Sequence, residues 1–154
     1  MGSNEVHRIG RVGVIGAGVM GSGIAAHLAS AGIPVLLVDI VPRDAPALPA
    51  DRDAPEFSAM SARRSAIAAA AIGNLSKSKP SPYQKAVDLA RIAAGNLEDD
   101  LAELGACDWI VEAVVERLDI KQSVFARLDA VRGANTIITS NTSGIPLAAM
   151  VQGR

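Results

Sequence analysis

A glycine-rich turn between two apolar segments constrains the fold of this chain more than any other feature. Residues 12–15 form a short apolar run of the kind found in parallel strands that are buried on both faces. Gly16, Gly18 and Gly21 follow directly in the spacing G-x-G-x-x-G. In that spacing the first glycine permits a tight turn, the second leaves room for a phosphate near the backbone, and the third lets the next helix pack closely against the strand. The N-terminus of that helix would favour an anion, because its first N–H groups lack partners within the helix and its dipole is positive there.

The residues after the glycines complete the pattern of a dinucleotide site. Apolar residues at helical spacing lie on roughly one face of the next segment: Val19, Met20, Ile24, Leu28 and Ala29. A second apolar strand then ends at Asp39, about 20 residues beyond the glycines, where a ribose-binding carboxylate is expected. Such a carboxylate accepts hydrogen bonds from ribose hydroxyls and repels a 2′-phosphate, so the sequence predicts NAD rather than NADP. An ordinary glycine turn in an α/β protein remains the alternative.

Composition narrows the class of protein further. With 154 residues, of which 49% are hydrophobic, the chain can form one domain with a substantial core. Its net charge of −1, with both signs scattered along the chain, predicts neither nucleic-acid binding nor a membrane-surface role. The apolar region 12–38 is interrupted by glycines and Pro34, so we interpret it as strand, turn and helix rather than a membrane span. Cys107 is the single cysteine, and we expect it to be a small core residue in a protein of a reducing compartment. No signal peptide is recognised at the start of the sequence, so the expected location is the cytoplasm. No metal site is predicted.

The middle of the chain departs from a simple alternation of strands and helices. Residues 40–56 contain four prolines and predict a long loop, which in a compact domain is often functional. Residues 57–75 and 83–94 have helical patterns and together predict a helical hairpin that projects from the sheet. Three lysines lie on its solvent side: Lys77, Lys79 and Lys85. We interpret them as a solvated surface, with a contact for an anionic ligand tail as the alternative. A one-turn helix is expected after Asp99 and Asp100, which could cap it.

The second half of the chain returns to alternating strands and helices. Segments 108–115 and 136–139 have the composition of strands, whereas 117–131 and 146–150 are helical in pattern. The longer of these helices has one apolar face: Ile120, Val124, Leu128 and Val131. The alternation predicts an α/β fold, a doubly wound parallel sheet of the Rossmann type that carries the hairpin as an insertion.

Polar groups cluster at the carboxyl ends of the predicted strands, where open α/β sheets bind their ligands. Glu112 lies inside an apolar run, so an ionised carboxylate there requires hydrogen-bonding partners. Glu116 begins a helix and is interpreted either as a helix cap or as a site residue. Residues 140–143, Ser-Asn-Thr-Ser, form a dense set of donors and acceptors, with an ordinary polar turn or helix cap as the alternative. Neither histidine offers a general base, because His7 lies in the polar leader and His27 inside the first helix.

Together these motifs resemble the NAD-binding domain of L-3-hydroxyacyl-CoA dehydrogenases. The resemblance rests on four segments in order: Val14-Ile-Gly-Ala-Gly-Val-Met-Gly-Ser-Gly-Ile24, Val38-Asp39, Asp108-Trp-Ile-Val-Glu-Ala-Val-Val-Glu-Arg-Leu-Asp-Ile-Lys121 and Ser140-Asn-Thr-Ser-Gly144. The E-A-V-V-E segment with its downstream lysine and the S-N-T-S segment are more specific than the glycines. The proline-rich loop and the Ser78-Lys79-Pro80 stretch are most similar to the larger members, in which this domain is joined to an enoyl-CoA hydratase-like module.

The resemblance implies a reaction, a cofactor and a set of site residues. The family oxidises an L-3-hydroxyacyl-CoA of fatty-acid β-oxidation to the 3-ketoacyl-CoA and transfers a hydride to NAD, so an acyl-CoA is the implied substrate. Ser143 would hydrogen-bond the substrate's 3-oxygen, and Glu116 would complete the catalytic set. The implied cofactor-binding residues extend from the glycine turn to the last strand: Gly16, Gly18, Val19, Met20, Gly21, Asp39, Glu116, Lys121 and Asn141.

The same resemblance implies that residues 1–154 are an NAD-binding domain that is incomplete at its C-terminal end. In the family, a histidine paired with a glutamate removes the hydroxyl proton, and it lies in a G-T-H-F-F-N-P-like stretch that would come after Arg154. The helical C-terminal domain of the family is expected to be absent as well. The chain alone should therefore bind NAD with little or no dehydrogenase activity. Strand 136–139 is expected to form an exposed sheet edge that invites self-association.

Two other functions stay open from the sequence. The first is a stand-alone, non-catalytic NAD(H)-binding module that pairs with a second chain. The second is a dehydrogenase for a hydroxyacid that carries no CoA, such as a sugar acid. A histidine-containing segment further along the reading frame would favour the acyl-CoA dehydrogenase over the first alternative, and dependence of activity on the CoA moiety would exclude the second.

Overall fold

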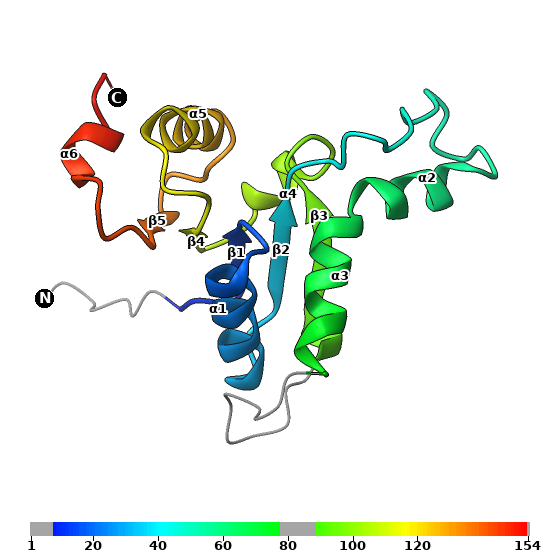
Figure 1. The fold of residues 1–154 in the computed structure, drawn as a ribbon, viewed down its shortest axis with the longest axis horizontal. Coiled ribbons are helices and arrows are strands. Elements are labelled where there is room, and N and C mark those ends of the chain that lie inside the picture. The colour runs from blue at the N-terminus through cyan, green and yellow to red at the C-terminus, as the bar shows by residue number, and fades with distance from the viewer. Residues whose placement is uncertain (1–7, 78–88, 154) are drawn as a thin grey trace, which may run out of the picture.

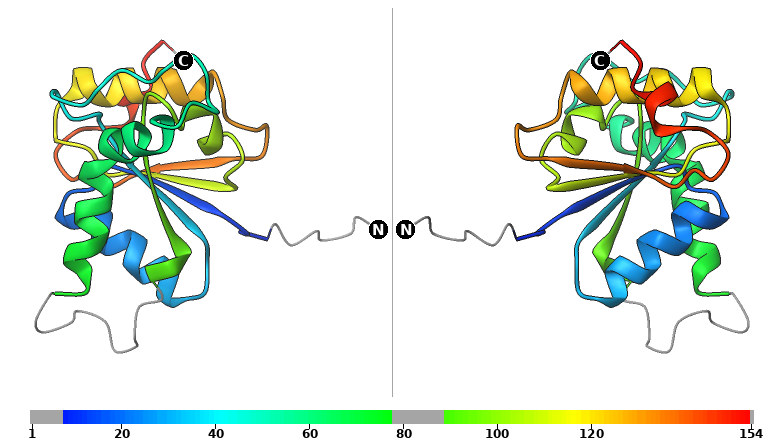
Figure 2. Two further views of the ribbon diagram at one scale, coloured as in Figure 1. Left: turned by 90° about the vertical axis from the view of Figure 1, so that its right-hand side faces the viewer. Right: turned by 90° about the vertical axis from the view of Figure 1, so that its left-hand side faces the viewer.

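Five parallel strands form one twisted sheet with helices on both faces (Figures 1 and 2). The computed structural model describes residues 8–77 and 89–153. The strands are β1 (Val12–Ile15), β2 (Val35–Asp39), β3 (Ile92–Asn96), β4 (Trp109–Glu112) and β5 (Ile137–Ser140). They lie in the order β3-β2-β1-β4-β5, so the chain moves outward from the central β1 in one direction and then crosses over to the other side. The predicted doubly wound parallel sheet is confirmed.

The helices form a layer on each face of the sheet. On one face lie α1 (Val19–Ser30) and α3 (Ala66–Leu75), which follows α2 (Phe57–Arg64). On the other face α5 (Leu118–Asp129) is the long helix, and α4 (Leu101–Leu104) and α6 (Leu147–Met150) are single turns that pack on the same side. The sheet is therefore covered in the way that parallel sheets require.

The central strand β1 is buried on both faces, as its apolar run predicts. Val12 and Val14 pack toward α1, whereas Ile15 packs toward α5, and none of the three has any exposed surface. Cys107 is buried in the layer on the α5 side, which confirms its prediction as a core residue, and burial raises the pKa of its thiol. Each fully buried valine or isoleucine side chain contributes about 1.5–3 kcal/mol to the free energy of folding. The position of β1, and with it the start of the turn that follows, is therefore strongly stabilised.

Helix α1 buries only part of its predicted apolar face. Leu28 and Ala29 are buried and Ile24 is half-buried, but Val19 and Met20 are 89% and 57% exposed. The first turn of α1 lies at the ends of the strands, where no described element covers these two residues. They are therefore available to a ligand or to another part of a protein.

Residues 89–94, the described part of the predicted second helix of the hairpin, do not form a helix of that kind. Residues 83–88 lie outside the described part of the chain, Leu89–Arg91 form a 3₁₀ turn, and Ile92–Asn96 form β3. Two alanines in this strand favour a helix locally, but pairing along the whole length of β2 outweighs that preference. The stretch 57–75, predicted as one helix, is interrupted at Ser65, and α3 packs on α1 and β3 rather than projecting from the sheet. Of the three predicted surface lysines, Lys77 is exposed, and Lys79 and Lys85 lie outside the described residues.

Arg64 anchors the long loop 40–56 to the sheet. Its guanidinium donates to both Asp99 carboxylate oxygens, at 2.6 and 3.0 Å, and to the carbonyl oxygen of Pro46 at 3.1 Å. The hydrogen bonds from Arg64 lower the pKa of the Asp99 carboxyl. Asp99 therefore does not cap α4 as predicted, and Asp100, which occupies the N-cap position, accepts a hydrogen bond from the β3 backbone instead of capping the helix with its side chain.

Strand β5 is an edge of the sheet, as predicted. It pairs with β4 on one side, and Ile137 on it is 48% exposed. Within residues 8–77 and 89–153, no helix has the length and apolar character needed to cross a membrane.

Candidate functional site

The turn between β1 and α1 requires glycine at two positions. Gly16 has a φ of +101°, and a Cβ there would lie 2.5 Å from the carbonyl oxygen of Ala113. A Cβ on Gly21 would lie 1.7 Å from the carbonyl oxygen of Gly16, so only glycine lets the helix approach the turn this closely. At Gly18 a Cβ would meet nothing within 4 Å, which leaves the backbone open to a ligand. The tight turn and the close packing predicted from the glycine spacing are both present.

The N-terminus of α1 and the carboxylate of Asp39 lie together at this turn. Gly18 is the N-cap of α1, and among the described residues no side chain caps the first N–H groups of this helix, so they and the positive end of the helix dipole are open to a ligand. Asp39, at the end of β2, accepts a hydrogen bond from the Ala17 N–H at 2.5 Å through Oδ2 and from the Ile40 N–H at 2.7 Å through Oδ1. Each carboxylate oxygen has a second lone pair, so Asp39 can still accept from a ligand hydroxyl.

A cleft of about 620 Å³ begins at this turn and continues to the start of α5. Its lining residues come from the turn, from the ends of β2 and β3, from the loop after β4 and from α5: Gly16, Gly18, Asp39, Ile40, Leu97, Ala113, Val114, Val115, Asp119, Ile120, Ser123, Val124 and Arg127. The volume is within the range of about 300–1,000 Å³ typical of small-molecule sites. An anion-binding helix end and a ribose-type acceptor on one apolar cleft fit a dinucleotide, which is the group that the sequence predicts.

A buried ion pair lies on the α5 side of the same strand ends. Neither side chain of Glu112 and Lys121 has exposed surface, and the ammonium donates to the two carboxylate oxygens at 2.9 and 3.1 Å. The carboxylate also accepts from the Val114 N–H at 2.7 Å and from the Ser140 hydroxyl. The requirement that a carboxylate at position 112 has hydrogen-bonding partners is therefore met in full.

Glu116 holds the loop that follows β5. Its side chain is 44% exposed, and Oε1 accepts hydrogen bonds from the Thr142 hydroxyl and from the Gly144 N–H, the latter at 3.0 Å. Oε2 lies 3.5 Å from the Lys121 ammonium. The hydrogen bond from Thr142, followed by that from Gly144, lowers the pKa of the Glu116 carboxyl, so it is an ionised acceptor at neutral pH. Glu116 makes no cap at the start of α5, whose N-cap is Arg117.

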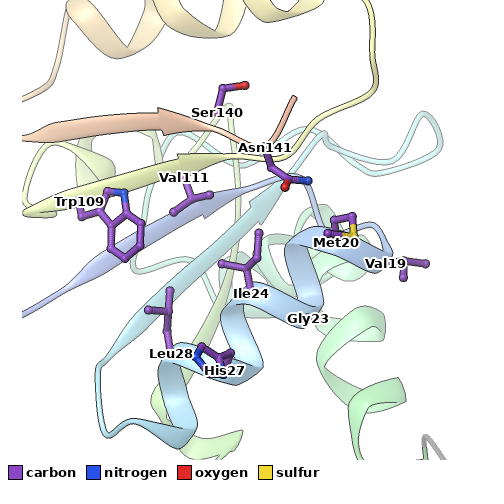
Figure 3. A pocket seen from close by; sticks show the side chains of 10 residues that line it. All are labelled: Val19, Met20, Gly23, Ile24, His27, Leu28, Trp109, Val111, Ser140 and Asn141. Atoms are coloured by element: carbon purple, nitrogen blue, oxygen red, sulfur yellow. The ribbon is translucent and has the colours of Figure 1, made fainter. Parts of the chain in front are cut away.

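A second, apolar groove of about 490 Å³ lies on the opposite face of the sheet, between α1 and β4 (Figure 3). Val19 and Met20 line its open end together with Asn141, and Trp109 lies deeper along β4. The indole N–H of Trp109 donates to the Thr139 hydroxyl at 2.9 Å, which ties β4 to the edge strand. The groove is distinct from the cleft beside Asp39, because the sheet lies between them.

The structure brings most of the predicted site residues to one edge of the sheet, but not all to one surface. Gly16, Gly18 and Asp39 border the cleft and Gly21 is buried behind the turn, whereas Val19, Met20 and Asn141 border the apolar groove. Ser143 is exposed in the loop held by Glu116. Lys121 has no exposed surface, so in this structure its ammonium reaches a ligand only through other residues.

The pairing of Lys121 with Glu112 was not predicted, although the sequence contains a signal for it. Lys121 falls three and seven residues before Val124 and Leu128, on the apolar face of the same helix. A lysine on a buried helix face, next in the chain to a strand with a buried glutamate, indicates an internal ion pair. The roles of Ser140 and Thr142 as donors to the two glutamates were not predicted, because they depend on how β4 and β5 are paired.

Comparison with known proteins decides the family. Residues 11–154 match the family model described as 3-hydroxyacyl-CoA dehydrogenase, NAD binding domain. The chain belongs to this family. The cofactor of the family is NAD, in agreement with the prediction from Asp39 and the glycine turn.

Individual relatives agree with the family assignment. The chain is 47% identical over 147 residues to a Bacillus subtilis protein named as a probable 3-hydroxyacyl-CoA dehydrogenase, covering 95% of this chain and 18% of the relative. It is 32% identical to a fatty acid oxidation complex subunit alpha of Pseudomonas syringae, covering 98% of this chain and 19% of that protein. The crystal structure of a 3-hydroxybutyryl-CoA dehydrogenase from Escherichia coli superposes with a TM-score of 0.67 at 28% identity, covering 96% of this chain and 27% of that one. The domain therefore spans about one fifth of these two curated relatives.

Proposed function

We propose that this domain binds NAD in the cleft beside Asp39 as the cofactor-binding unit of an L-3-hydroxyacyl-CoA dehydrogenase. The observation that supports this most directly is the junction of Gly16, Ala17 and Asp39, where an open helix N-terminus and a ribose-type acceptor meet at one cleft. The pyrophosphate would lie against the first turn of α1 and the adenosine ribose against Asp39. When bound, NAD supplies the hydride acceptor for oxidation of the hydroxyl carbon to a 3-keto group.

The residues after β5 would receive the reacting end of the acyl-CoA. Ser143 is exposed between Thr142 and Gly144, and both of these neighbours are held by Glu116. A hydroxyl held in this way can donate to the 3-oxygen of the substrate as charge changes on that atom. Because Glu116 is ionised and already accepts two hydrogen bonds, its role in the proposed site is to position this loop.

The described residues do not provide a general base for the hydroxyl proton. His27 is exposed on α1, in the wall of the apolar groove and not in the cleft. Loss of a general base typically lowers the rate by about 10²–10⁴. We therefore propose that these 154 residues bind NADH while turning over acyl-CoA poorly by themselves, and that groups outside them complete the site. A stand-alone NAD(H)-binding module remains the second candidate, since it would share the same cleft.

A paired titration tests the proposal. The purified chain is titrated with NADH and, in parallel, with NADPH, following nicotinamide fluorescence. Saturable binding of NADH with clearly weaker binding of NADPH is the expected result, because Asp39 would repel the 2′-phosphate. Binding of neither cofactor would refute the proposed function. Turnover of acetoacetyl-CoA with NADH at a rate typical of complete dehydrogenases would refute the claim that the base lies outside these residues.

Two further proposals concern the surroundings of the domain. The exposed edge of β5, with Ile137 on it, would let two copies associate through their sheets at high concentration. A rise in molar mass with concentration in light scattering, abolished by Ile137→Lys, would support this. The buried, single Cys107 is suited to a reducing compartment, and we propose the cytoplasm as the location, to be checked with a fluorescent fusion.

A further inference from the structure

A cluster of polar side chains holds the ends of β2 and β3 next to Asp39. Asn96, the last residue of β3, pairs in register with Asp39 and has no exposed surface. Its side-chain oxygen accepts from the N–H groups of Glu98 and Asp99, at 3.0 and 2.9 Å. Its amide nitrogen donates to Ser65 Oγ at 3.1 Å and to Asp99 Oδ2 at 2.9 Å. Both ends of this buried amide have partners, so the turn after β3 is firmly held.

Arg64 connects this cluster to the long loop that follows β2. Its guanidinium donates to both carboxylate oxygens of Asp99 and to the carbonyl oxygen of Pro46. Figure 1 shows the loop leaving the end of β2 and returning to the sheet through α2. Hydrogen bonds inside the loop, such as that from the Ala45 N–H to the Pro42 carbonyl at 3.0 Å, do not tie it to the sheet. One side chain therefore bonds to the segments that follow both β2 and β3.

Both of these segments border the cleft in which we propose that NAD binds. Ile40 begins the loop after β2, Leu97 begins the turn after β3, and both line the cleft together with Asp39. The Leu97 N–H donates to the Asp39 carbonyl oxygen at 2.9 Å, and the Leu97 carbonyl oxygen accepts from the Arg127 guanidinium. The surroundings of the Asp39 carboxylate therefore depend on how these two segments are held.

The contact between Arg64 and Asp99 is suited to orienting the two segments. Two N–H groups of one guanidinium donate to the two oxygens of one carboxylate, which fixes direction as well as distance. Ordering one loop residue costs about 1–2 kcal/mol, and a loop that is already ordered spares a ligand that cost. The contact can therefore affect the affinity of a ligand beside Asp39 without touching it.

We propose that Arg64 is a positioning residue for the adenosine end of the NAD site. Through Asp99 and Pro46 it holds the turn after β3 and the loop after β2 so that the Asp39 carboxylate is presented to the adenosine ribose. Arg64 itself does not line the cleft. The inference rests on the proposed NAD binding.

A double-mutant cycle between Arg64 and Asp39 tests this role. Affinities for NADH and for ADP-ribose, which contains the adenosine end but no nicotinamide, are measured by calorimetry well below the lowest melting temperature. The proteins are wild type, Arg64→Met, Asp39→Ala and the double variant. We expect Arg64→Met to weaken both ligands by about fivefold, the size of losing one hydrogen bond. In the Asp39→Ala background the same substitution should change affinity by no more than about twofold, because the carboxylate that Arg64 positions is gone.

Two further variants control for charge and for stability. Arg64→Lys keeps the positive charge near an anionic ligand but loses the planar fork, so we expect an intermediate loss of about twofold for both ligands. Arg132→Met is the matched control, because it removes a partly exposed ion pair to Asp129, at 2.9 Å, beyond the cleft-lining part of α5. This control should leave both affinities unchanged. The melting temperature is recorded for every protein.

The outcomes separate positioning from a purely structural role. An equal loss of NADH and ADP-ribose affinity in Arg64→Met that largely disappears in the Asp39→Ala background supports positioning. The same fold-loss in both backgrounds overturns it, because an effect independent of Asp39 indicates general weakening of the site. Unchanged affinities in Arg64→Met with a lower melting temperature overturn it in favour of stability alone, and a loss for NADH without a loss for ADP-ribose overturns the assignment to the adenosine end.

Failure of the proposed function gives a different result. If the wild-type protein binds neither NADH nor ADP-ribose, the proposed NAD site is refuted, and the inference fails with it. If the wild-type protein binds both ligands and the cycle shows no coupling between Arg64 and Asp39, only the inference fails.

Discussion

Replacing Lys121 alone with methionine should destabilise the domain strongly. The substitution keeps the length of the side chain but removes the ammonium that contacts both oxygens of Glu112, at 2.9 and 3.1 Å. The carboxylate stays fully buried and retains two partners, the Val114 N–H and the Ser140 hydroxyl. Breaking a buried pair by removing one partner typically costs about 3–5 kcal/mol, and the two remaining donors favour the lower end, about 3 kcal/mol. For a chain of this size that corresponds to a melting temperature lower by roughly 6–12 °C.

Urea denaturation followed by circular dichroism measures this loss, with differential scanning calorimetry as a second probe. The control is Arg132→Met, which removes a partly exposed ion pair to Asp129 and should shift the melting temperature by no more than about 2 °C. Adding Glu112→Gln to Lys121→Met should recover most of the stability, because the unpaired charge is gone. A Lys121→Met protein as stable as wild type would refute the reasoning, since it would mean that the Glu112 carboxylate reaches solvent or another cation.

Three further predictions concern the cleft and its supports. Asp39→Asn keeps an oxygen for the Ala17 N–H but removes the charge, so the difference in affinity between NADH and NADPH should become smaller. Asp39→Ala also removes the acceptor and should weaken the binding of both cofactors by about tenfold or more. Fluorescence titration of the two variants with each cofactor distinguishes these effects. Gly16→Ala should lower the free energy of unfolding by about 1–3 kcal/mol and abolish NADH binding, because φ is +101° there and a Cβ would lie 2.5 Å from the Ala113 carbonyl oxygen. The control is Gly73→Ala in α3, where the space is open, and it should raise the free energy of unfolding by about 0.5–1 kcal/mol. Urea denaturation measures both changes. Arg64 lowers the pKa of the Asp99 carboxyl, so the stabilisation from this contact is fully present above the ordinary value of 3.8 and is lost as the pH falls through the lowered pKa. The melting temperatures of wild type and Asp99→Asn should therefore converge on acidification. A difference between them that stays constant with pH would contradict the assignment.

The parts of the fold that could be predicted are those whose signals are local. The run 12–15, the glycine spacing and the position of Asp39 each depend on a few consecutive residues, and the structure has the predicted strand, turn, helix and second strand. The edge position of β5 was expected from the family resemblance and not from a local signal.

The parts that could not be predicted depend on contacts between distant segments. Residues 92–94 continue the predicted helical pattern, but Ile92–Asn96 forms a strand because it pairs with β2 along its full length. Val19 and Met20 look like core residues on a helical projection, but their burial depends on where the strands end relative to α1. The pairing of Lys121 with Glu112 needs the helix and the strand to be packed, although the position of the lysine on an apolar helix face was a usable signal.

The hydrogen bond between the Ala17 N–H and Asp39 has a consequence for how cofactor preference could change in evolution. The same carboxylate that would select NAD also completes the turn of which Gly16 is a part, so position 39 carries a structural demand and a specificity demand at once. A substitution that introduces a cation for a 2′-phosphate satisfies the second demand and removes the acceptor required by the first. A lineage that places a cation at position 39 would need a replacement acceptor for Ala17 before, or together with, that change, whereas Asp39→Asn keeps an acceptor but adds no partner for the 2′-phosphate. A direct step from the carboxylate to a cation at this position is therefore unfavourable in this domain.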